Sequence, residues 1–394
     1  MKNSQKGLIV PLLIIVALLI IGGAYVVYEN ISIEPLSIVK TKVQQSNEIQ
    51  PVNTQTPKIN TQKDSINIIK ATTNTVAQSL PPLNFNKPLT TSEDNQAFLD
   101  DLNKRPAMEL ISAWKQQITK TNYAQLDFLE IALSMKIKAN PDSTEAKAIY
   151  SFANDFLKNG TPNDSGTRIR LVKWLGQGGG VPVVGILLNL FDQTSDKELQ
   201  REILSQLINI SSISYGSNAE AISRIFETRW HDAVIPKDMS SGSVLFTFGP
   251  AIAKLGTSGG VKVLLDDVLR GGQTRSYFKS NADLKSQIAL MALDQVRSDS
   301  SIALLAQGMK GSSDDMRLFA SGETLTNISS PASTKVLVDW AVQADDTDAI
   351  LVENWLSRLR DTDSRKVVRY LFIDPVTFHS DQVKQAVARA IKSY

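Results

Sequence analysis

A helical pattern that recurs along most of the sequence constrains the fold more than any other feature. Two copies are close: LGQGGGVPVVGILLNLF (175–191) and LGTSGGVKVLLDDVL (255–269) both read Leu-Gly, two residues, Gly-Gly and then an apolar helix. Looser copies carry Ser or Asp in place of the glycines, and a longer amphipathic helix precedes each one. The leading residues recur at intervals of 32, 48, 38, 32 and 34 residues: Leu175, Leu207, Leu255, Leu293, Leu325 and Leu359. This period predicts helix pairs that stack and share one core, because a single pair cannot bury its apolar faces alone.

The pattern over residues 167–373 resembles HEAT repeats, in which the first helix ends in an apolar residue near a Gly- or Asp-containing turn and the second opens on Val or Ile. The resemblance implies an all-α fold: an α-solenoid of about six helix pairs over residues 161–394, closed by a C-terminal capping helix. Tetratricopeptide repeats fit less well. Trp174 and Leu175 lack their Trp-to-Leu spacing, and the interval of 48 residues breaks their stricter period.

The glycine clusters at these turns raise the alternative of a phosphate-binding loop. A P-loop needs Lys and then Ser or Thr directly after its last glycine, but Val181 and Pro182 stand there. We therefore interpret the clusters as turns between paired helices, with Gly176 ending the first helix in the left-handed conformation and Pro182 in the first turn of the next. The turn glycines are Gly176, Gly178, Gly179 and Gly180 in the first copy and Gly256, Gly259 and Gly260 in the second.

Composition excludes several kinds of site. The sequence has no cysteine and two histidines, which excludes disulfides, thiolate sites and multi-histidine metal sites. A net charge of +2 lacks the strong basic bias expected of a nucleic-acid-binding protein, so the sequence predicts no nucleic-acid partner. His231 beside Asp232 could act as a general base, but no nucleophile with a recognisable context accompanies it, so we interpret it as a loop residue. Adjacent acids such as Asp314-Asp315 and Asp345-Asp346 diverge on a helix and are interpreted as helix caps. The sequence predicts no enzyme, no cofactor and no small-molecule ligand.

The N-terminus carries a membrane signal. Residues 8–28 form an apolar run without a charge, long enough to span a bilayer as a helix. Lys2 and Lys6 precede the run, which places residues 1–7 in the cytoplasm and the main domain outside. One alternative is a cleaved signal peptide, for which Gly22-Gly23-Ala24 supplies small residues. Another is a type IV prepilin cut after Gly7, a resemblance weakened because Leu12 stands where those proteins carry Glu.

Between the apolar run and the helices lies a segment of different composition. Residues 29–91 are rich in Gln, Asn, Thr and Pro and are predicted to form a flexible linker, because such a segment buries too little apolar surface to offset its ordering entropy. From residue 92 the apolar spacing is helical, which predicts an N-terminal helical region over 92–160, including a helix capped by Asp142.

These features together predict a binding protein. We expect a membrane-tethered, extracytoplasmic scaffold of the bacterial inner membrane that engages another protein of the cell envelope. A pilus or secretion-system component, and an envelope enzyme without a recognisable motif, are the alternatives. The candidate partner-binding residues gather near the end of the sequence: Arg358, Arg360, Arg365, Lys366, Arg369, Trp340 and Trp355.

Overall fold

The described part of the protein is entirely helical in its regular structure. The computed structural model describes residues 80–85, 89–120, 123–160, 164–234, 243–373 and 376–394. These ranges contain eighteen α-helices and two short 3-10 helices, together with one isolated bridge between Thr274 and Asp315. The predicted all-α class is confirmed for these residues.

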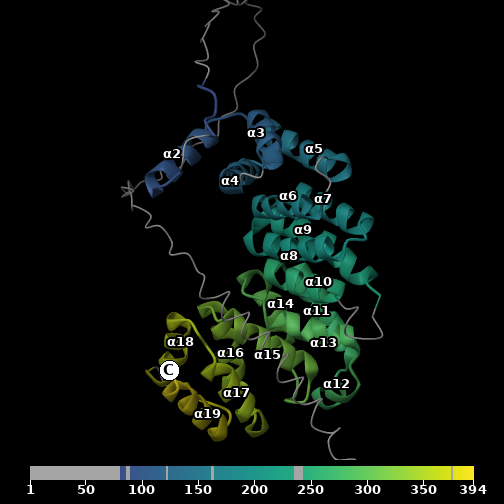
Figure 1. Cartoon of the computed structure of the whole chain (residues 1–394). Helices are drawn as coiled ribbons and strands as arrows, with labels where there is room; N and C mark the ends of the chain where they lie inside the picture. The colour runs from purple at the N-terminus through teal and green to yellow at the C-terminus, as the bar shows by residue number, and fades with distance from the viewer. Residues whose placement is uncertain (1–79, 86–88, 121–122, 161–163, 235–242, 374–375) are drawn as a thin grey trace, which may run out of the picture. The chain divides into compact units, whose positions relative to one another are not determined.

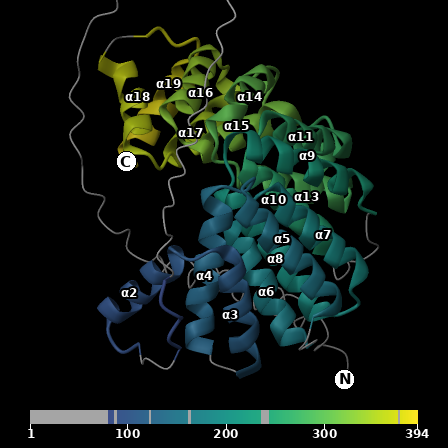
Figure 2. The same cartoon turned by 90° about the horizontal axis from the view of Figure 1, so that it is seen from above.

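The helices pack in two layers (Figure 1; Figure 2). The first layer contains α2 (Ser92–Asn103), α4 (Tyr123–Ala139), α6 (Ser165–Gly178), α8 (Lys197–Ile213), α10 (Ser243–Leu255), α13 (Leu284–Leu293), α15 (Met316–Ile328), α17 (Ala349–Ser357) and α19 (Asp381–Lys392). The second layer contains α3 (Ala107–Lys120), α5 (Thr144–Asn159), α7 (Val181–Gln193), α9 (Gly216–Asp232), α11 (Ser258–Gly271), α14 (Ile302–Gly308), α16 (Pro331–Gln343) and α18 (Thr362–Ile373). Among the described residues, a helix contacts the following helix of its own layer, the pair α11 and α14 excepted. The short α12 (Arg275–Asn281) is inserted between α11 and α13, and the 3-10 helices η2 (Asp299–Ser301) and η3 (Asp346–Asp348) lead into α14 and α17.

The leucines that revealed the repeat mark one recurring packing position. Each lies at or near the C-terminal end of a first-layer helix, and none of the six is more than 6% exposed: Leu175, Leu207, Leu255, Leu293, Leu325 and Leu359. In the amphipathic helix around Leu293, the spacing of Leu284, Ile288, Met291 and Val296 predicts one apolar stripe, which is only partly right because Met291 is 59% exposed. The sequence period is thus a period of the core, and the fold is repeat-like.

Three buried tryptophans are fixed in the same way. Each indole Nε1–H donates to a carboxylate, at 3.0, 2.5 and 2.8 Å in sequence order, and an arginine pairs with that same carboxylate. Such charge-assisted bonds are shorter and stronger than neutral ones, and here they join neighbouring helices or helix ends. The three sets are Trp114, Glu130 and Arg170; Trp230, Asp267 and Arg270; and Trp355, Glu323 and Arg358.

The glycine turns lie close to the predicted positions but differ in detail. Helix α6 continues through Gly176 and ends at Gly178, so the prediction that Gly176 ends it in the left-handed conformation is wrong. The residues with positive φ are Gly179 (69°) and Gly180 (91°). A side chain at Gly176 is excluded instead by close approach of α8, because a Cβ there would lie 2.2 Å from Gln206 Oε1. The position of Pro182 in the first turn of α7 is confirmed.

In the second copy, a single glycine makes the turn. Gly256, with φ 62°, follows the last residue of α10. Gly259 and Gly260 lie inside α11, which begins at Ser258, so their prediction as turn residues is wrong. Gly260 is needed for packing, because a Cβ there would lie 2.6 Å from Ile252 Cγ2.

The N-terminal predictions fall mostly outside the described residues. The apolar run 8–28 is among these, and within the described ranges no helix combines the length and hydropathy needed to cross a membrane. Leu80 is exposed, but the next residues already contact the helices, inside the predicted linker. Phe85 stacks edge-on against Phe98 of α2, and the buried Arg105 donates from Nη2 to the Pro81 carbonyl at 2.6 Å.

Candidate functional site

A row of pockets lies along the second layer, between α3, α5, α7 and α9. The α3–α5 pocket has a volume of about 720 Å³, and the α7–α9 pocket about 610 Å³. Two pockets of about 340 and 380 Å³ lie between α5 and α7 and share Asn154, Ile186 and Asn189, so we treat them together as the α5–α7 groove. These pockets arise because successive second-layer helices pack side by side and leave furrows between their exposed residues.

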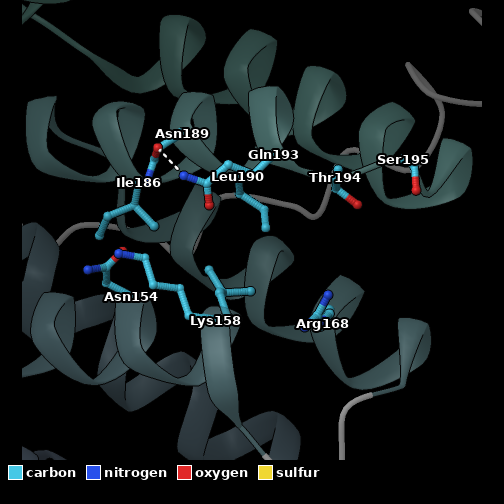
Figure 3. A pocket seen from close by; sticks show the side chains of 10 residues that line it. Asn154, Lys158, Arg168, Ile186, Asn189, Leu190, Gln193, Thr194 and Ser195 are labelled. Atoms are coloured by element: carbon cyan, nitrogen blue, oxygen red, sulfur yellow. Dashed lines mark hydrogen bonds between the residues drawn. The ribbon is translucent and has the colours of Figure 1, made fainter.

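The α5–α7 groove is lined mainly by polar side chains. In Figure 3, Asn154 and Lys158 of α5 face Ile186, Asn189 and Leu190 of α7, and the Lys158 side chain extends toward Asn154. Arg168, from α6, lies toward the end where Thr194 and Ser195 lie. The residues lining the 340 Å³ part are Asn154, Leu157, Lys158, Arg168, Ile186, Asn189, Leu190, Gln193, Thr194 and Ser195.

The charge in this groove is positive. Lys158 and Arg168 line the 340 Å³ part, and the described residues that line it include no Asp or Glu. Arg168 Nε is buried, and no hydrogen-bond acceptor for it occurs within the described ranges. The positive charge of Arg168 acts on the carboxylate of Asp196, which follows the lining residue Ser195. The pKa of Asp196 is lowered first by the Ser165 hydroxyl, which donates to it at 2.6 Å, and to a smaller extent by the charge of Arg168.

The flanking grooves differ because each is lined by an acid and because the cation in each already makes a contact. In the α7–α9 groove, Arg229 makes two bonds to Asp192, at 3.0 and 2.5 Å. In the α3–α5 groove, the Lys115 ammonium lies over the Phe152 ring, 5.0 Å from its centroid. Met108, also in that groove, is 61% exposed. Of these three grooves, the α5–α7 groove is the one whose described lining residues include cations and no acid.

Several of the predicted partner-binding residues have partners within the protein. Arg358 pairs with Glu323 at 2.7 Å and Lys366 with Asp363 at 2.6 Å, so these cations have carboxylate partners. Trp355 is 1% exposed and cannot serve as a surface anchor; the physical reason is its role in the core, where Nε1 donates to Glu323.

The other aromatic candidate, Trp340, packs on this buried ring. The Trp340 and Trp355 ring centroids are 5.2 Å apart, and Trp340 is partly buried. The two tryptophans therefore pack against each other where α16 and α17 meet, and both contribute to the core.

The remaining arginines gather at the C-terminal end of the protein. The Arg365 and Arg369 guanidinium groups lie over the Tyr394 ring, 5.1 and 5.7 Å from its centroid. Burial raises the pKa of the Tyr394 hydroxyl to about 12, and this hydroxyl donates to the Leu356 carbonyl at 2.8 Å. Arg360 is exposed, and its backbone N–H donates to Ser329 Oγ. Arg365 and Arg369 thus help hold the C-terminal residue in place.

The histidines and paired acids have structural positions. His231 lies in the last turn of α9 rather than in a loop, and it is exposed. His379 is also exposed, with Nε2 3.3 Å from Asp345 Oδ1. Asp315 accepts from two backbone N–H groups at the start of α15, and Asp345 caps η3, as the cap interpretation predicts.

Lys285 is a buried lysine that joins two helices. Lys285 is 7% exposed, and burial lowers its pKa. Its Nζ donates to the Trp230 carbonyl at 2.7 Å and lies over the Trp230 ring. A cation at the carbonyl end of α9 is favoured by the helix dipole, so Lys285 joins α13 to α9.

The groove residues were missed by the sequence reasoning. A signal was present: Asn154 and Lys158 on one second-layer helix match Asn189 and Gln193 on the next, each pair with i, i+4 spacing. Polar pairs on an exposed helix face are common, however, and their opposition across a groove becomes visible only once the helices are packed.

No family model matches the sequence, and no curated protein matches it. Two solved structures of engineered proteins are similar to this protein. One is 19% identical, covers 77% of this protein and 86% of its own length, and has a TM-score of 0.26. The other is 16% identical, covers 61% of this protein and 95% of its own length, and has a TM-score of 0.22.

Proposed function

We propose that this protein is a binding scaffold that holds a peptide segment of a partner protein against its second helix layer. The observation that carries the proposal is the row of pockets between α3, α5, α7 and α9. Consecutive pockets on one layer suit an elongated ligand, because each furrow can accept one or two residues of a peptide that crosses the helices. Helical-repeat proteins of the HEAT type, which the sequence pattern resembles, present such extended surfaces.

The lining chemistry favours a peptide over an apolar small molecule. Asn154, Asn189 and Gln193 carry amides, which both donate and accept hydrogen bonds and so match peptide groups. Apolar side chains such as Ile186 and Leu190 lie between them. This mixture is typical of protein interfaces, whose contact area is partly apolar and whose hydrogen bonds fix register.

We further propose that the scaffold is tethered to a bacterial inner membrane and faces the cell envelope. The apolar run 8–28 has the length of a membrane span, and Lys2 and Lys6 on its N-terminal side favour a cytoplasmic start. A tether raises the local concentration of the binding surface near partners in the same membrane, which increases occupancy without any new contact.

The test is position-specific crosslinking in cells with the full-length protein. A photoreactive amino acid would replace Ser151 or Thr228, which line the grooves, and Arg201, an exposed residue of first-layer helix α8, as the matched control. The proposal expects one discrete adduct from both groove positions and none from Arg201. Equal adducts from all three positions, or no adduct from the groove, would reject the second layer as the binding surface.

A further inference from the structure

The described residues that line the 340 Å³ part of the α5–α7 groove include two cations and no acid, and the nearby Asp196, outside that lining, interacts with the Arg168 charge. Arg168 lies at one end with its Nε buried and without an acceptor among the described residues, and Lys158 extends toward the other end. Because Arg168 lines the groove, an anion in it can accept hydrogen bonds from the guanidinium nitrogens beyond the buried Nε. A guanidinium can hold a carboxylate through two parallel hydrogen bonds, which fixes orientation as well as charge.

The amides beside Arg168 indicate what the anion is attached to. Gln193 Nε2 donates to Asn189 Oδ1 at 2.8 Å, one turn away on α7. This bond uses one donor of Gln193 and one acceptor of Asn189, and it leaves the Gln193 carbonyl and the Asn189 amide nitrogen for a ligand. Thr194 and Ser195 add hydroxyls at the Arg168 end. Neutral donors and acceptors in this number suit peptide groups more than a free inorganic anion, which needs donors only.

We propose that the α5–α7 groove selects a peptide segment that bears a carboxylate, which Arg168 binds while Asn189 and Gln193 bond the adjoining peptide groups. The carboxylate can belong to an acidic residue or to the free C-terminus of a peptide. The volume of about 340 Å³ is near the lower end of ligand sites, roughly 300–1,000 Å³, so it holds a few residues of a longer peptide. This inference rests on the proposed function and names the ligand chemistry of one groove.

The experiment titrates the isotope-labelled full-length protein in detergent micelles with four probes. The side-chain amide signals of Asn154, Asn189 and Gln193 are followed by NMR. Two probes carry a carboxylate: acetyl-Gly-Gly-Glu-Gly-Gly-amide, and acetyl-pentaglycine with a free C-terminus. The third, acetyl-Gly-Gly-Gln-Gly-Gly-amide, is neutral, and the fourth is inorganic phosphate. We expect the groove signals to move with at least one carboxylate peptide at millimolar concentration, and about tenfold more weakly with the neutral peptide, as loss of a charge-assisted bond implies.

Arg168→Gln tests the assigned residue and keeps a polar side chain of similar reach. We expect it to weaken binding of the carboxylate peptides about tenfold, to the level of the neutral peptide. Lys158→Gln has a smaller effect because its ammonium lies toward the Asn154 end. Lys254→Gln, an exposed residue of α10 outside the groove, removes the same charge and leaves the titrations unchanged. A stronger response to the Glu peptide than to free-carboxyl pentaglycine identifies an acidic residue as the source, and the reverse identifies a peptide terminus.

Three results would overturn the inference: a neutral peptide that binds as well as the carboxylate peptides, phosphate that binds as well as they do, or Arg168→Gln that binds normally. These failures are separable from failure of the proposed function, because crosslinking from Ser151 and Thr228, which the carboxylate assignment does not involve, reports occupancy of the layer whatever the charge of the ligand. Adducts at these positions together with no carboxylate preference would keep the scaffold and remove the selectivity.

Discussion

Two turns with nearly the same sequence connect their helices differently. In LGQGGGV, the first helix runs through Gly176 to Gly178, and Gly179 and Gly180 make the turn before α7 begins at Val181. In LGTSGGV, the first helix, α10, ends at the leading leucine. Helix α11 begins at Ser258, the fourth residue of the motif, whereas α7 begins at the seventh residue of its own motif. The same glycine pattern therefore does not place the turn.

One residue explains the difference. Thr257 Oγ1 accepts a hydrogen bond from Gly260 N at 3.1 Å and so caps α11. The first copy has Gln177 at this position, which is a poor N-cap, and Gly180 precedes α7 without a side-chain capping bond. With nothing to start a second helix earlier, α6 continues until the glycines end it. The cap residue sets the turn, and the glycines accommodate it.

The largest expected effect is at Gly256. Replacing it with Ala forces a side chain into a left-handed residue and puts Cβ 2.5 Å from Ser298 Cβ. We expect the free energy of unfolding to fall by about 3 kcal/mol, the sum of backbone strain and overpacking. Urea unfolding would measure it. Adding Ser298→Gly should recover the steric part; no recovery would mean that the backbone conformation alone is responsible.

Gly180→Ala should cost less than Gly256→Ala. At φ 91° and ψ 159° an L residue is strained, but the nearest atoms to a new Cβ, on Pro141 and Pro182, are 3.8 Å away. We expect a loss of about 2 kcal/mol from backbone strain alone. The same unfolding measurement decides the order. If Gly180→Ala proved the more damaging change, steric crowding at Gly256 would not be the distinguishing feature of the two turns.

Thr257→Ala tests the cap directly. It removes the bond to Gly260 and the contact with the Ser223 hydroxyl, 2.7 Å away. We expect a loss of about 1 kcal/mol. Thr257→Ser keeps the capping hydroxyl and serves as the control, while Gln177→Ala at the matching position of the first copy should change stability by less than about 0.5 kcal/mol, as an exposed residue without a cap does. Equal losses at both positions would contradict the role given to the cap.

These comparisons show how far the sequence could predict the fold. Apolar spacing located the helices and the buried leucines, because burial repeats with the helix period. Boundaries were less certain where several capping residues stand together: Ser143, not Asp142, caps α5. Gly176 was misplaced because close packing against α8, like a turn, excludes a side chain, and a sequence alone does not separate these two causes.

The candidate site could be predicted less well, for a different physical reason. Arg358 reads as a free cation in sequence, yet its partner Glu323 lies on another helix, and the fold alone brings them together. The reverse holds for Arg168. It belongs to a first-layer helix, but it reaches the groove between two second-layer helices. Whether a charge is paired or available depends on contacts between repeats, which the local pattern does not encode.

The smallest expected effect concerns Glu130, the carboxylate that accepts the hydrogen bond from Trp114. Burial raises the pKa of Glu130 from its ordinary value of 4.5, while the bonds from Trp114 and Arg170 act in the opposite direction. Because the folded state then binds the proton more tightly than the unfolded state, Glu130 contributes stability that is complete below pH 4.5 and is lost as the pH rises through the folded pKa. The opposing bonds keep this loss small.

Glu130→Gln removes the titration and keeps an oxygen that can accept from Trp114 Nε1. The free energy of unfolding of the original protein, relative to that of this variant, should therefore fall as the pH is raised above 4.5. It should stop changing once the pH exceeds the folded pKa. Urea unfolding at a series of pH values measures this slope. The opposite slope would mean that the ion pair with Arg170, 2.8 Å from the carboxylate, outweighs burial. Glu130 would then hold its helices chiefly through charge, and its indole bond would be secondary.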